Sequence, residues 1–98
     1  MGDRGRVLEA LYAAVDDVNL LLPPRDRLAK AEATVLLGDA AHLDSLGFLN
    51  LVLAAETQVN ARCAPPVNLA ERLLELDEAS LPATLGALAT LIVELQGS

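Results

Sequence analysis

Residues 43–55 read LDSLGFLNLVLAA, which places a helix start directly before the most apolar run of the chain. Asp and Ser are both favoured as helix caps, because their side-chain oxygens accept hydrogen bonds from the free amides of the first turn. Proline disfavours the helical conformation of the residue before it. The stretch therefore predicts a helix that begins at Asp44-Ser45, runs to about Ala61 and is closed by Pro65-Pro66.

The first turns of this predicted helix are apolar around nearly their whole circumference, from Leu46 to Ala55. A helix that is apolar all round is normally buried all round, yet a domain of this size can hardly bury every face of one. We therefore expect part of this surface to be exposed. Exposed apolar patches tend to be partner sites.

Apolar residues recur at three- and four-residue spacing on both sides of this helix. The pattern predicts a helix from about residue 5 to 20, stopped by Pro23-Pro24, and a last helix from Thr84 to Gln96 with Thr84 as its cap. A shorter helical pattern covers Val67 to Leu76. The chain thus predicts three substantial helices and one short one.

The connection from Arg25 to Asp44 is long for so small a domain. Long ordered loops are often functional or are held by packing. We expect this one to be held against the core by the three consecutive apolar residues Val35, Leu36 and Leu37.

The composition supports a single all-α domain spanning residues 1–98. Hydrophobic residues make up 53% of the chain, mainly Leu, Ala and Val, and Tyr12 and Phe48 are its only aromatics. Strands favour β-branched and aromatic residues, whereas Leu and Ala favour helices. No apolar run approaches the roughly 18 to 20 residues of a membrane span. The helix-periodic segment after the N-terminal lead carries Glu9, Asp16 and Asp17, so it does not resemble the apolar stretch of a signal peptide. We expect a soluble, cytoplasmic, monomeric protein that does not bind membranes.

The net charge of −7 is unevenly spread, because residues 31–98 hold nine acidic residues against only Arg62 and Arg72. Nucleic-acid binding requires clustered Lys and Arg, so it is disfavoured. Partners with basic surfaces are the natural complement.

Conventional catalysis and metal binding find little support in the residue pattern. His42 lies three residues before Ser45, but no third group is placed to orient it, and we interpret it as a loop histidine. The single cysteine, Cys63, rules out an internal disulfide and a cysteine-cluster metal site. We expect no metal site and no enzymatic activity of the chain's own.

Ser45 allows two interpretations from the local sequence alone. It can be part of an ordinary helix cap, worth about 1 kcal/mol. Alternatively, its hydroxyl can carry a phosphodiester, because the amides and dipole at a helix N-terminus favour an anion by roughly 0.3 to 1 kcal/mol.

The chain as a whole resembles an acyl carrier protein. The resemblance is carried by Leu43-Asp44-Ser45-Leu46 before an apolar helix, by Glu56 eleven positions after the serine, by the Pro-bounded turn with Val67, and by the closing residues 84–88. It covers essentially residues 5–96 and implies an acyl-carrier-type four-helix bundle with a long first loop. It also implies that Ser45 is joined to 4′-phosphopantetheine by a phosphopantetheinyl transferase, so that the arm's thiol carries acyl groups as thioesters.

The resemblance also implies how partner enzymes that load and process the acyl group would recognise the chain. Family members often carry acids at the second and fifth positions after the serine, where this chain has Gly47 and Asn50. We therefore expect recognition to depend on Phe48, Leu49 and Leu51 more than on charge, through basic or apolar docking surfaces of the partners. The implied recognition residues are Asp44, Leu46, Phe48, Leu49, Leu53 and Glu56. Glu56 is also open to interpretation as a merely solvated charge.

Two alternatives remain at this point. The same fold serves aminoacyl or peptidyl carrier domains, and the cargo has no signature in the sequence. A protein of another class, an unmodified helical interaction module, would use Leu46 to Ala55 as its docking surface.

Overall fold

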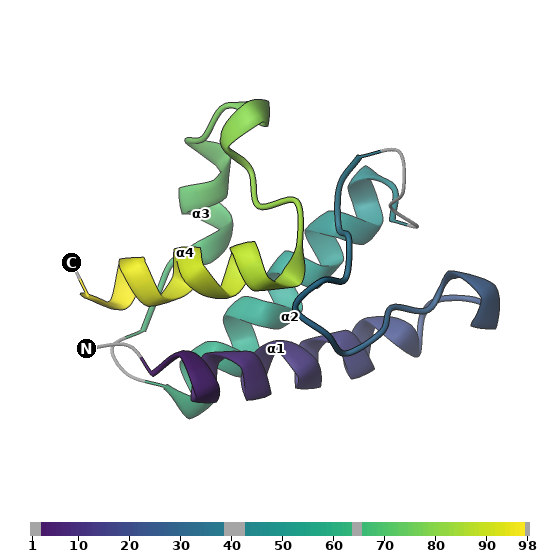
Figure 1. Cartoon of the computed structure of the whole chain (residues 1–98), viewed down its shortest axis with the longest axis horizontal. Coiled ribbons are helices and arrows are strands. Elements are labelled where there is room, and N and C mark those ends of the chain that lie inside the picture. The colour runs from purple at the N-terminus through teal and green to yellow at the C-terminus, as the bar shows by residue number, and fades with distance from the viewer. Residues whose placement is uncertain (1–2, 39–42, 64–65, 98) are drawn as a thin grey trace.

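A computed structural model describes residues 3–38, 43–63 and 66–97. Within these ranges the chain forms four α-helices and two single turns of 3-10 helix and has no strand (Figure 1). The helices are α1 (Arg4–Asn19), α2 (Ser45–Arg62), α3 (Leu69–Leu74) and α4 (Leu85–Gly97); the turns are Pro24–Asp26 and Glu78–Ser80. The all-α prediction, with three longer helices and a short one, is confirmed. The arrangement specific to acyl carriers stays a prediction.

The helix ends lie close to the predicted ones, except in α3. Asp3 caps α1, because its Oδ1 accepts hydrogen bonds from the amides of Gly5 and Arg6 at 3.0 and 3.3 Å. Helix α3 is shorter than the predicted range of 67–76. Its last turn tightens, since the amide of Leu76 donates to the carbonyl three residues before it.

Helices α1, α2 and α4 enclose the core. Helix α1 packs against both α2 and α4, and α3 packs against α2. Figure 1 shows α1 and α4 running side by side, α2 crossing behind them and α3 standing at a steep angle to α4. The largest fully buried side chains are aliphatic: Val7, Leu11, Val15, Leu36, Leu51, Val52, Val59, Leu69, Leu85, Leu88 and Ile92.

One polar side chain interrupts this aliphatic core at the last turn of α4. Gln96 is 4% exposed, and its Oε1 and Nε2 find no hydrogen-bond partner among the described residues. A buried amide without partners lowers the free energy of unfolding, since both atoms were hydrogen-bonded to water in the unfolded chain.

Two asparagines at helix ends hold the connections that follow them. Asn19 donates from Nδ2 to the carbonyl of Leu28 at 3.0 Å and accepts from its amide at 2.8 Å. Asn60 holds Val67 in the same way, at 2.9 and 2.8 Å. Leu28 and Val67 are both buried, so each asparagine supplies hydrogen-bond partners to the backbone amide and carbonyl of a buried residue.

The first connection is held against the core, as predicted. Leu36 is fully buried, and Val35 and Leu37 are half-buried. The amide of Leu36 donates to the carbonyl of Ala83 at 2.7 Å, and Val35 and Thr84 form an isolated antiparallel bridge. The connection is therefore fastened to the segment that leads into α4.

Candidate functional site

Helix α2 begins where the sequence predicted, at Ser45. Asp44 precedes it in an extended conformation and is exposed. Its Oδ1 accepts a hydrogen bond from the amide of Gly47 at 2.7 Å, so Asp44 is the cap of the helix. His42 lies outside the described residues.

Gly47, in the first turn of α2, lies close to Leu43 and Asp44, the two residues before the helix. A Cβ at this position would lie 3.1 Å from Cδ2 of Leu43 and 3.2 Å from Oδ1 of Asp44. Leu43 is half-buried and packs against the core. The entering chain thus folds back over the first turn, and a side chain at this position would require the Leu43 and Asp44 side chains to shift slightly.

The two faces of α2 differ in burial. Leu51, Val52, Ala55 and Val59 form the inner face and are buried, and Phe48 packs half-buried beside them. On the opposite side, Leu46 is 65% exposed, Leu49 44% and Leu53 46%. The expectation that part of this apolar helix is exposed is confirmed.

One expected recognition residue is corrected by this burial. Leu51 is fully buried, so it contributes to the core and offers no contact to a partner. Leu46, Leu49 and Leu53 share the outer face because they lie three and seven residues apart, which is close to whole turns of a helix.

The outer face near Ser45 carries no formal charge. Residues 46–53 contain no acidic or basic side chain, and Asp44 supplies the only carboxylate of the helix start. Contacts to this face would therefore be apolar, as the residue pattern predicted.

Glu56 has a structural contact that neither interpretation of the sequence included. It is half-buried, and its Oε1 accepts a hydrogen bond from the amide of Ala70 at 3.3 Å. Ala70 lies in the first turn of α3, where Asn68 makes no side-chain cap. Glu56 thus satisfies a free amide of α3. Its role in partner recognition stays a prediction.

Other features of the described chain lie apart from this site. Cys63 is a half-buried free thiol at the end of α2. A surface groove lies between Leu95 of α4 and the segment 66–75, which includes α3, and no residue of α2 lines this groove. Within the described ranges, no three His, Cys, Asp or Glu residues gather closely enough to bind a metal ion. None of the helices there combines the length and apolarity needed to cross a membrane.

The candidate site is therefore the start of α2 together with its outer face. It consists of Asp44 and Ser45 followed by Leu46, Leu49 and Leu53. The site thus combines a serine at a helix start with an exposed apolar surface on the same helix. No protein-family model, no curated protein and no solved structure matches this chain.

Proposed function

We propose that this chain is an acyl carrier protein whose Ser45 is the attachment point of 4′-phosphopantetheine. The observation that carries the proposal is the start of α2, where an exposed Asp44 caps the helix, Ser45 is its first residue and Leu46 is exposed behind it. This geometry agrees with the acyl-carrier resemblance of residues 43–46.

The residues present fit the prosthetic group. Its phosphodiester is an anion, and the first turn of a helix favours anions through its free amides and dipole. The Asp44 carboxylate bonds the amide of Gly47, while no other segment of the described chain supplies an acceptor to the amide of Leu46. When bound, the arm supplies a terminal thiol that holds acyl groups as thioesters.

The outer face of α2 is the proposed docking surface for the partner enzymes. Its three exposed leucines lie on the same side of the helix that begins at Ser45. A partner that covers Leu46, Leu49 and Leu53 removes apolar surface from water at roughly 25 cal/mol per Å². The phosphopantetheinyl transferase and the acyl-processing enzymes would share this surface.

Mass spectrometry tests the attachment directly. The purified chain is incubated with a broad-specificity phosphopantetheinyl transferase and coenzyme A, and we expect the mass of one phosphopantetheinyl unit to be added. Ser45→Ala should abolish the addition, whereas the matched change at an exposed serine, Ser80→Ala, should leave it intact. Unchanged mass of the wild-type chain with several transferases would rule the carrier function out.

The exposed leucines also support a second candidate, an unmodified helical interaction module. Such a module needs the outer face of α2 but not the hydroxyl of Ser45. This second function would be favoured if no mass is added and if a partner protein binds the wild-type chain but not Leu49→Asp. If the shift occurs, the thioester found on chain isolated from its native cell distinguishes an acyl cargo from an aminoacyl or peptidyl one.

A further inference from the structure

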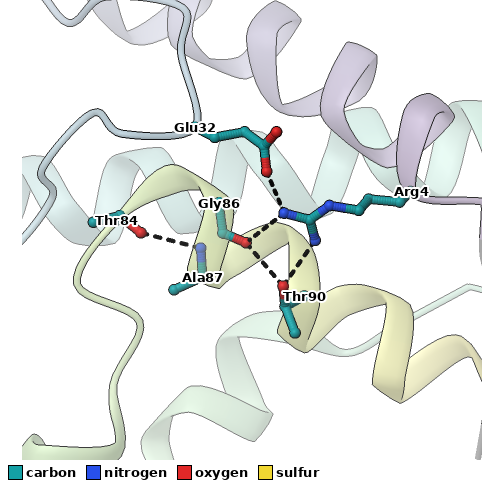
Figure 2. Close-up of polar contacts among 6 residues, drawn as sticks. All are labelled: Arg4, Glu32, Thr84, Gly86, Ala87 and Thr90. Carbon is teal, nitrogen blue, oxygen red and sulfur yellow. Dashed lines mark hydrogen bonds and ion pairs between the residues drawn. The ribbon is translucent and has the colours of Figure 1, made fainter.

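Helix α3 begins without a side-chain cap of its own. The other three α-helices of the described ranges each start behind a side chain that accepts hydrogen bonds from their first turn: Asp3 before α1, Asp44 before α2 and Thr84 before α4 (Figure 2). Asn68, at the same position before α3, makes no such bond. The amide of Ala70 donates instead to Oε1 of Glu56, in α2, at 3.3 Å. The start of α3 is thus completed by a side chain from another helix.

A second residue of α2 holds the segment that leads into α3. Asn60 donates to the carbonyl of Val67 at 2.9 Å and accepts from its amide at 2.8 Å. Asn60 lies four residues after Glu56, so both side chains leave the same face of α2, one turn apart. We call Glu56 and Asn60 the α3 tie.

The α3 tie continues the outer face of α2. Leu53 is followed by Glu56 and Asn60 at spacings of three and four residues, as Leu46 is followed by Leu49 and Leu53. Such a series stays on one side of an α-helix. The outer face therefore has two parts, because residues 46–53 expose leucines whereas residues 56–60 hold α3.

The position of α3 depends on its contacts with the rest of the chain. It has only six residues, and so short a helix is not stable by itself in water. Its Leu69 and Leu73 are buried, but apolar contact is non-directional. A hydrogen bond requires a defined distance and angle, so the α3 tie is what fixes the first turn of α3 on α2.

We propose that Glu56 is a positioning residue for partner docking and not itself a contact to the partner. Its carboxylate is half-buried and is used within the chain. It holds the first turn of α3 one turn beyond Leu53, so that a partner covering the exposed leucines meets α3 in one position. The docking part of this inference rests on the proposed function, whereas the hold on α3 does not.

The test compares Glu56→Ala with Glu56→Gln, which removes the charge but keeps an accepting oxygen. Glu9→Ala is the control, an equal change of charge at an exposed position of α1. Hydrogen exchange is measured at the amides of Ala70 and Arg72, with Leu88 in α4 as the reference amide. The phosphopantetheinyl transferase is assayed with coenzyme A for kcat and for the KM of the carrier.

We expect Glu56→Ala to accelerate exchange at Ala70 and Arg72 by about threefold to tenfold, because one hydrogen bond to the first turn is lost. Exchange at Leu88 should stay unchanged. KM should rise about twofold to fivefold with kcat unchanged, since a smaller fraction of the protein holds α3 in place. Glu56→Gln should stay within about twofold of the wild type in both measurements, because its oxygen still accepts from Ala70. Glu9→Ala should behave as the wild type.

Unchanged exchange at Ala70 in Glu56→Ala would overturn the hold on α3. Faster exchange with an unchanged KM would overturn the positioning role. A KM that rises equally in Glu56→Gln and Glu56→Ala, with normal exchange in Glu56→Gln, would show that the partner reads the charge directly, against this proposal. A wild-type chain that no transferase modifies would remove the carrier function and the docking role, while the exchange rates would still decide whether Glu56 holds α3.

Discussion

The starts of α2 and α4 resemble each other locally but differ in their surroundings. Each begins after a side-chain cap: Oδ1 of Asp44 accepts from Gly47 at 2.7 Å, and Oγ1 of Thr84 accepts from Ala87 at 3.1 Å. Each then continues into leucines. By the capping rules alone the two would be equivalent.

The first connection makes the difference between them. It covers the start of α4 and supplies carbonyls to the amides of Leu85 and Gly86, whereas within the described ranges no other segment covers the amide of Leu46 in this way. The covered start is part of the core. At the start of α2, Asp44 and Leu46 are exposed instead, and this is where we propose that the prosthetic group is attached.

The largest expected effect tests this difference with one leucine from each start. Leu85 is fully buried, so Leu85→Ala should lower the free energy of unfolding by about 2 to 5 kcal/mol. Leu46 is 65% exposed, so Leu46→Ala should change it by less than about 0.5 kcal/mol. Urea unfolding followed by circular dichroism measures both. Equal losses would show that the start of α2 is as buried as that of α4.

The glycines of the two starts give the next comparison. Gly86→Ala should lower the free energy of unfolding by about 1 to 3 kcal/mol, because the carbonyl of Glu32 cannot move without releasing the connection. At Gly47 the nearest atom is a terminal methyl of Leu43, which can rotate away. Gly47→Ala should therefore change stability by less than about 1 kcal/mol, helped by the higher helix propensity of alanine. Urea unfolding of both variants checks this, and a greater loss at Gly47 would contradict it.

A smaller effect is expected at the opposite end of α4. Gln96→Leu should raise the free energy of unfolding by about 1 kcal/mol, because it removes two buried polar atoms without partners. Gln58→Leu is the control, since Gln58 is half-buried and its amide donates to Asp17 at 2.9 Å. Thermal unfolding should show a higher midpoint only for the change at Gln96. A lower midpoint there would mean that the amide has a partner in solution.

The smallest expected effect distinguishes the two properties of Asp44 at the start of α2, namely its capping oxygen and its negative charge. Asp44→Asn should change the free energy of unfolding by only a few tenths of a kcal/mol, because asparagine keeps a capping oxygen, whereas Asp44→Ala and Thr84→Ala should each lower it by about 1 kcal/mol. We expect Asp44→Asn also to slow the modification of Ser45, measured by mass against time. A rate equal to that of the wild type would show that the carboxylate serves only as a cap.

Much of the fold could be predicted from the sequence because its signals are local. Pro23-Pro24 ends α1, Asp44 starts α2 and Thr84 caps α4, and each of these residues acts on amides or dihedral angles within one turn of itself. The helix start that forms the candidate site was predictable for the same reason, since a cap followed by an apolar helix is visible in consecutive residues; its function stays a prediction.

Contacts between residues far apart in the sequence leave no local signal of this kind. Three examples are the hydrogen bonds between Asn19 and Leu28, the hydrogen bond from α3 to the Glu56 carboxylate, and the ion pair between Arg4 and Glu32. Each joins groups whose spacing in the sequence has no helical or strand period. The sequence also left the core and docking faces of α2 undetermined, and wrongly included Leu51 among the residues expected to contact partners, because a helix that is apolar all round has no periodicity to orient it.

The sequence by itself determined where the helices begin and end, and that one serine stands at the start of the most apolar of them. The tertiary structure alone decided which leucines of that helix are buried, and that the described part of the first connection covers the start of α4. The physical reason is that caps and prolines act within a turn, whereas burial depends on which segments pack together. Here the described part of the first connection packs on α4, and Leu46 in the first turn of α2 is left 65% exposed.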